Sequence, residues 1–176
     1  MCDFSEDSIL KNPHEASCEE IFNALCLEIA LYYKPLGGKF AKSGPHITFK
    51  KQNLTLKLCF WSSSFNVKGE HVNLEVIPNF YCSLLPDKKG YFFGYPAVFN
   101  TSEVRAKNNF NVYGVTYTEF LEIISLIDNY ILTALDAFLN YANTNQYLAT
   151  IEPKLLQYAL DNNTGLNAFL KTLDKC

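Results

Sequence analysis

Apolar and polar residues alternate along the middle of the chain, which is the pattern of half-buried β-strands. Four stretches show it: KFAKS (39–43), HITFKK (46–51), NLTLKLCFWSS (53–63) and EHVNLEVIPNFY (70–81). The turn-forming sequences SGP, KQN and NVKG separate them. Because short turns join consecutive strands, the pattern predicts an antiparallel meander in which each strand pairs with the next along the chain.

Alternation divides the residues of these strands between two faces of the sheet. One face is apolar and is expected to form the core: Ile47, Phe49, Leu54, Leu56, Leu58, Phe60, Val72, Leu74 and Val76. The opposite face is mixed: Thr48, Lys50, Thr55, Lys57, Cys59, Trp61, His71, Asn73, Glu75 and Ile77. This second face is either ordinary surface, a face covered by another helix, or the surface that meets a partner. Pro78 indicates that the fourth of these strands is an edge or carries a bulge.

Helical periodicity precedes and follows the strands. We expect the first helix to begin with Asn12 as N-cap, Pro13 at the first helical position and Glu15 as the capping-box acid, and to end near Pro35. Thr116 followed by Glu119 predicts the start of a long helix that runs to about residue 141. Two shorter helices are expected at 150–160 and 166–173.

This order of elements predicts one α+β domain over residues 1–176. It would contain an antiparallel sheet of about four to six strands, with the N-terminal helix and the C-terminal helices packed on one face. The composition agrees, since 48% hydrophobic and 15% aromatic residues exclude a disordered chain. The acidic start MCDFSEDSIL does not resemble an export signal, and no apolar stretch matches the roughly 20 residues of a membrane span, so we expect a cytoplasmic protein.

Charge is unevenly distributed along the chain. Residues 1–28 carry seven acids against Lys11, a net charge of −6, whereas residues 34–68 carry seven lysines and no acid, a net charge of +7. Whether these lysines converge decides between an anion-binding patch and a solvated surface. Arg105 is the single arginine, and arginine is the residue that phosphate and base recognition favours. Nucleic-acid binding is therefore disfavoured.

Sequence motifs of catalysis are missing from the chain. It has no phosphate-binding loop, dinucleotide fingerprint, nucleophile elbow or HExxH motif, and its six cysteines have no zinc-ligand spacing. We therefore expect no catalytic residue, no metal and no cofactor. One alternative is a small hydrolase or nucleotide-processing enzyme that uses loop carboxylates with His71, for which Cys59 is the plausible nucleophile. Another is a small-ligand-binding module with an aromatic pocket that includes Tyr91, Phe93 and Tyr95.

The first half of the chain resembles a family of small bacterial proteins that includes immunity proteins of polymorphic toxin systems. The resemblance lies in pattern over residues 20–82: a helix ending KPLGGKFAKSG, then HITFKK, a strand ending FWSSS, and HVNLEVIPNF. It implies a protein-interaction module that binds and blocks a cognate toxin by occlusion. Tryptophan is enriched at binding hot spots, so the candidate docking residues are Trp61, Lys57, His71, Asn73 and Glu75.

Overall fold

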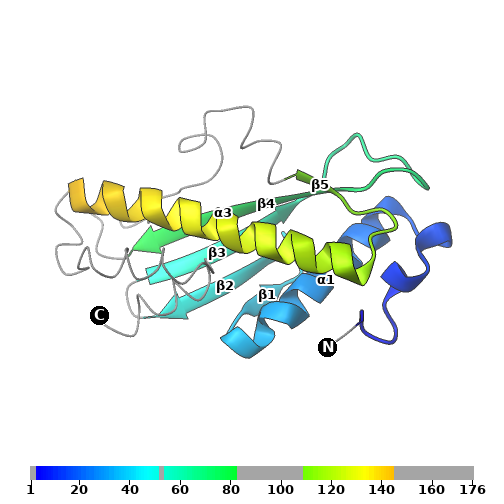
Figure 1. Cartoon of the computed structure of the whole chain (residues 1–176), viewed down its shortest axis with the longest axis horizontal. Coiled ribbons are helices and arrows are strands. Elements are labelled where there is room, and N and C mark those ends of the chain that lie inside the picture. The colour runs from blue at the N-terminus through cyan, green and yellow to red at the C-terminus, as the bar shows by residue number, and fades with distance from the viewer. Residues whose placement is uncertain (1–2, 52–53, 83–108, 145–176) are drawn as a thin grey trace.

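The computed structural model describes residues 3–51, 54–82 and 109–144 of the chain. Its elements are the 3₁₀ turns η1 (Ile9–Lys11), η2 (Pro13–Glu15) and η3 (Lys34–Leu36), the helices α1 (Cys18–Tyr33) and α3 (Tyr117–Thr144), and the strands β1 (Lys39–Ala41), β2 (His46–Lys51), β3 (Leu54–Trp61), β4 (Asn73–Cys82) and β5 (Asn109–Asn111). The expected α+β fold is confirmed (Figure 1). The helices expected at 150–160 and 166–173 lie outside the described residues, as does the aromatic segment around Tyr91.

The five strands form one antiparallel sheet in the order β1-β2-β3-β4-β5, so the predicted meander is confirmed. Its register places Ile47 opposite Leu58, and Leu58 opposite Pro78, in one row of the apolar face. Pro78 does not mark an edge along the whole of β4, because β5 pairs with β4 at Asn73 to Glu75. Pro78 itself lies directly opposite Leu58 of β3.

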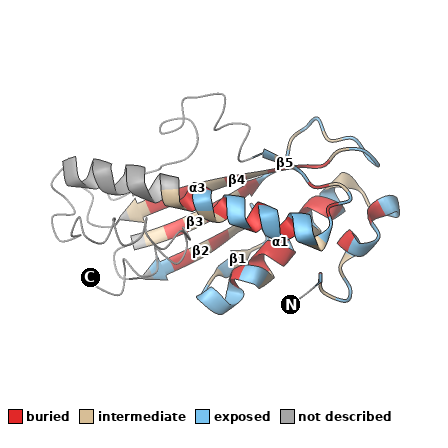
Figure 2. Cartoon of the chain, viewed as in Figure 1, coloured by how far each residue is buried: buried red, intermediate tan, exposed pale blue. Residues whose placement is uncertain are grey.

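Helices α1 and α3 cover the apolar face of the sheet (Figure 1). Tyr33, at the end of α1, meets the ring of Phe49 edge-to-face at 6.0 Å and donates a hydrogen bond to Asp128 of α3 at 3.2 Å. Burial raises the pKa of the Tyr33 hydroxyl well above its ordinary value, and the neighbouring Asp128 carboxylate adds to that effect. In Figure 2 the buried residues lie where the two helices meet the strands. The expected core face is therefore confirmed for every residue whose burial is described, which leaves out Leu54 alone.

The beginning of α1 differs from the expectation. Residues Pro13–Glu15 form only one 3₁₀ turn, Asn12 makes no capping hydrogen bond, and Ala16 is extended at φ −71° and ψ 149°. The helix begins five residues later, where the Ser17 and Glu20 side chains each bond the other's backbone N–H in a capping box. The start at Ser17 is favoured because the backbone N–H groups of Ser17 and Glu20 both gain hydrogen-bond acceptors, whereas the Asn12 side chain caps no N–H group. The capping box of Thr116 with Glu119 at the start of α3 is confirmed.

Two glycines carry the chain from η3 into β1. Gly37 has φ +87°, a left-handed conformation in which glycine has no steric penalty. At Gly38 a Cβ atom would lie 2.9 Å from Ile47 Cγ2 and 3.0 Å from the Phe49 ring, so the chain passes directly over the core at this point. The sequence PLGGKF is thus a helix stop followed by a close backbone approach, which places β1 against β2. Neither described helix has the length and apolar character needed to cross a membrane.

Candidate partner-binding site

Large apolar side chains are exposed where β3 ends and the chain turns back into β4. Trp61, the last residue of β3, is 60% exposed, and in the β3–β4 loop (residues 62–72) Phe65 is 85% exposed and Val67 is 47% exposed. The loop projects beyond the sheet in Figure 1, and most of it has the exposed colour in Figure 2. Phe65 is the most exposed large hydrophobic residue among the described residues. We call Trp61, Phe65 and Val67 the apolar tip.

Side-chain hydrogen bonds hold the base of this loop. Asn66 donates from Nδ2 to the Ser62 hydroxyl at 2.7 Å and accepts at Oδ1 from the Asn73 N–H at 2.8 Å. The Ser62 hydroxyl in turn donates to the Asn73 carbonyl oxygen at 3.0 Å. These three bonds form a closed ring of contacts between the two ends of the loop, which we call the Asn66 clip. Phe65 directly precedes the clip residue, so its backbone is held in place while its ring faces solvent.

The outer part of the loop is a second, smaller turn. Val67 and His71 exchange two backbone hydrogen bonds, Val67 N–H to His71 carbonyl at 2.8 Å and the reverse at 2.9 Å. The turn between them passes through Gly69, whose φ of +83° is the left-handed conformation that glycine adopts without strain. Hydrogen bonds from Ser17 hold the pKa of Glu20 below its ordinary value, and the charge of Lys68 contributes in the same direction.

The structure places the five candidate docking residues in different surroundings. Trp61 and Glu75 are directly opposite each other in β3 and β4 and share one face, as the pattern predicted. His71 belongs to the loop turn and is half-buried. Asn73 is only 5% exposed, and its side chain donates to that of Asn109 in β5, so it holds the strands together beneath the loop. Trp61 and Glu75 are thus the two candidates that meet at the apolar tip.

Lys57 lies apart from the apolar tip. It precedes Trp61 by four residues on β3, a separation of about 13 Å along an extended strand. It belongs instead to a row across the outer face of the sheet, made by Lys39 of β1, Thr48 of β2, Lys57 of β3 and Asn79 of β4. Lys50 lies two residues from Thr48 on the same face, whereas Lys42 faces α1. The lysines of residues 34–68 are therefore divided among several surfaces.

The pair of His71 with Cys59 that a catalytic dyad would use is not formed. Cys59 lies directly opposite His46 and Ile77 in the neighbouring strands, while His71 belongs to the loop beyond β3. Burial raises the pKa of the Cys59 thiol, although the Lys57 charge and a hydrogen bond from Asn79 oppose that effect. A raised pKa keeps the group a thiol at neutral pH, the opposite of an activated nucleophile. Within the described ranges, no three His, Cys, Asp or Glu side chains gather as metal ligands would.

Comparison with known proteins gives no relative. No family model, no curated protein and no solved structure matches the chain. The assignment of a function therefore depends on the surface itself.

Sequence reasoning missed Phe65 and Val67. Both lie in SSSFNVKGE, which has the turn residues of a loop and none of the alternation that marks a strand. The available signal was their chemistry, since apolar residues inside a Ser/Asn-rich turn have no core to enter. Alternation did identify Trp61, because its parity places it on the face opposite the core.

Proposed function

We propose that this protein is a protein-interaction module that docks a protein partner through the apolar tip. The observation that carries the proposal is the 85% exposure of Phe65 and the 60% exposure of Trp61 on a loop whose base is closed by the Asn66 clip. Exposure of aromatic side chains to water is unfavourable, and burial of Phe65 and Trp61 under a partner would remove this free-energy cost. Trp and Phe residues are also over-represented at the centres of protein interfaces.

Pre-organisation supports a docking role for this loop. A loop that is disordered before binding loses conformational freedom when it binds, which costs about 0.5–1.5 kcal/mol for each rotamer-rich side chain that becomes fixed. The Asn66 clip and the Val67–His71 turn fix the backbone of the loop before any partner arrives. More of the free energy gained by burying Phe65 therefore appears as affinity.

A protein surface suits this tip better than a small molecule. Small ligands bind in concave pockets that cover most of their surface, whereas Trp61 and Phe65 project from the end of a sheet. The same loop carries the exposed charged residues Lys68 and Glu70, and Glu75 lies directly opposite Trp61, so charges of both signs accompany the apolar residues. An apolar centre with a polar rim is the usual arrangement of a protein interface.

For the identity of the partner, we propose a toxin that the protein inhibits by occlusion. The support is the resemblance of residues 20–82 to bacterial immunity proteins, together with a binding surface that needs no chemistry of its own. In this mechanism the partner's active surface is covered by the apolar tip, and no bond is made or broken. A cytoplasmic location follows for a protein that protects the cell that makes it.

The test compares three proteins: wild type, the double variant Trp61→Ala with Phe65→Ala, and the control Leu121→Ala with Leu126→Ala. The control removes two apolar side chains of α3 that are 40% and 46% exposed. Each tagged protein is used to capture partners from its native cell lysate, and the affinity of any stoichiometric partner is then measured with purified proteins. We expect the tip variant to bind at least about 30-fold more weakly, as loss of a hot spot of about 2 kcal/mol implies, while the control binds like wild type.

The toxin proposal has its own readout. The identified partner is expressed in a host cell alone, with wild type, or with the tip variant. We expect growth arrest by the partner alone, rescue by wild type and failure of rescue by the tip variant. A tip variant that keeps its fold by circular dichroism yet binds its partner as wild type does would refute the docking site. A partner that binds through the tip but arrests no growth would refute the toxin proposal alone.

A further inference from the structure

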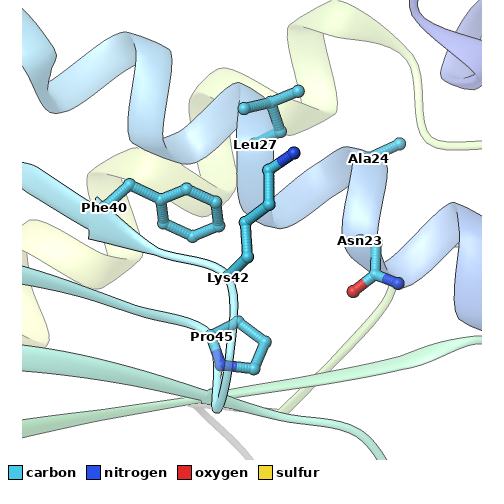
Figure 3. A pocket seen from close by; sticks show the side chains of 6 residues that line it. All are labelled: Asn23, Ala24, Leu27, Phe40, Lys42 and Pro45. Atoms are coloured by element: carbon cyan, nitrogen blue, oxygen red, sulfur yellow. The ribbon is translucent and has the colours of Figure 1, made fainter.

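A groove lies between α1 and the first strand of the sheet, and it shares no lining residue with the apolar tip (Figure 3). It has a volume of about 350 Å³ and is lined by Asn23, Ala24, Leu27, Phe40, Lys42 and Pro45. Figure 3 shows the Phe40 ring and the Leu27 side chain facing the same space from the strand and from the helix. Leu27 is 43% exposed, so its side chain is only partly covered by the rest of the protein. The groove is thus an apolar slot with an open side.

The strand that borders this groove is the edge of the sheet. β1 pairs only with β2 among the described strands, so its other side carries backbone groups that can accept a further strand. Phe40 lies opposite Ile47, in a row of the apolar face, and Lys39 lies opposite Thr48 on the outer face. A strand added beside β1 would therefore place its residues opposite Phe40 and Lys42 on the groove side and the intervening residue on the outer face.

Two exposed lysines at this edge favour a strand that carries negative charge. Lys39 and Lys42 are both exposed, and no acidic residue occurs between residues 29 and 69. Pairing of β1 with β1 of a second copy would bring lysines together, which disfavours a dimer at this edge. An acidic segment would instead be attracted to this edge, because Lys39 lies on the outer face and Lys42 lines the groove.

We propose that β1 and the α1–β1 groove bind an extended acidic segment of a protein partner by β-strand addition. The register predicts its sequence: an acidic residue opposite Lys39, an apolar residue opposite Phe40 that fills the groove beside Leu27, and an acidic residue opposite Lys42. Read antiparallel to β1, the segment has the pattern Asp-Thr-Leu-Asp. This site is separate from the apolar tip, and it does not depend on the function proposed for that tip.

The probe is the capped peptide Ser-Asp-Thr-Leu-Asp-Ser, titrated into the ¹⁵N-labelled full-length protein and followed by backbone amide shifts. The first control peptide replaces both Asp residues by Lys, and the second replaces Leu by Ser. We expect shifts confined to residues 23–27 and 38–45, and binding at least about tenfold tighter than that of either control peptide. Binding should also weaken as salt rises, because the attracting charges are exposed.

Three protein variants locate the binding. Leu27→Glu and Lys42→Glu each place a negative charge in the groove at an exposed position, so the fold is expected to persist, and each should weaken peptide binding about tenfold or more. Leu126→Glu, at a position 46% exposed on α3, is the matched control and should leave binding unchanged.

Several results would overturn the proposal. They are equal affinity for the acidic and basic peptides, shifts centred on the outer-face residues Lys50 and Lys57, binding that survives both groove variants, and no binding up to millimolar peptide. A concentration-dependent dimer abolished by Leu27→Glu would assign the groove to a second copy instead. Loss of the apolar tip by Trp61→Ala with Phe65→Ala should not change peptide affinity, so this proposal and the proposed function fail independently.

Discussion

The Asn66 clip gives a prediction that can be worked out from individual hydrogen bonds. Replacing Asn66 by Ala removes the acceptor of the Asn73 N–H and the donor to the Ser62 hydroxyl. The two losses differ in cost. Ser62 is exposed and can bond water instead, whereas Asn73 is 5% exposed and its N–H stays in the interior.

The magnitude follows from the buried donor. An unsatisfied buried hydrogen-bonding group costs about 1–3 kcal/mol, while an exposed bond exchanged for water costs little. We therefore expect Asn66→Ala to lower the free energy of unfolding by about 1–2 kcal/mol. For a chain of this length 1 kcal/mol shifts the Tm by about 2–4 °C, so the Tm should fall by about 2–8 °C. Asn66→Asp keeps an acceptor for the Asn73 N–H and should lose less than Asn66→Ala.

The assay combines a global and a local measurement. Denaturant unfolding followed by circular dichroism gives the free energy, and the fluorescence of Trp61, the single tryptophan, reports on the base of the loop. Hydrogen exchange of the Asn73 amide tests the buried bond directly, and it should become faster in Asn66→Ala. Ser64→Ala alters an exposed residue of the same loop and should change stability by less than about 0.5 kcal/mol.

Unchanged stability of Asn66→Ala would refute the structural role of the Asn66 clip. If Asn66→Ala unfolds at the wild-type denaturant concentration and the Asn73 amide keeps its protection, the clip does not hold the loop. The clip would then not pre-organise the loop for a partner. If the clip holds, Asn66→Ala should also weaken the partner complex, although Phe65 and Trp61 are unchanged, because the loop must be ordered on binding.

Two further predictions concern the core. Gly38→Ala should lower the free energy of unfolding by about 1–3 kcal/mol in denaturant unfolding, because its Cβ would lie 2.9 Å from the buried Ile47. Gly37→Asn should lower it less, because asparagine tolerates the left-handed conformation. Equal losses for the two variants would contradict this account. Burial raises the pKa of Cys26 to about 12, so the unfolded chain releases this proton first as the pH rises. Above pH 9 stability should fall by about 1.4 kcal/mol per pH unit from this group, and Cys26→Ala should remove that part of the slope.

Local pattern was sufficient to predict the sheet. Strand β2 was predicted with its observed bounds, His46–Lys51, because strict alternation and flanking turns leave one register in which the apolar residues face the core. The same parity placed Trp61 outside the core, on the face that also carries Glu75. Strand bounds and side-chain parity depend on residues close in sequence, so they can be predicted from one sequence without relatives.

The errors have non-local or competing causes. Asn73 was expected at the surface by its parity, but β5 pairs with it from almost forty residues away and buries it, and no local pattern announces that strand. The start of α1 was misplaced because two capping signals, at Asn12 and at Ser17, lie within six residues. The second satisfies more backbone groups, a comparison that requires the backbone path. Phe65 was missed because a loop has no periodicity to interpret.

The two proposed binding surfaces lie at one end of the sheet, and this has an energetic consequence. The Phe60 N–H donates to the Pro45 carbonyl oxygen at 2.9 Å, so the turn that closes the groove is tied to the strand end that carries Trp61. A partner that reached both surfaces would lose its translational freedom once while gaining two sets of contacts. Such a partner would bind much more tightly than a partner that contacts one surface alone, including the isolated peptide. Weak binding of an isolated acidic peptide is therefore compatible with a tight complex, provided that the groove and tip variants each weaken the same partner.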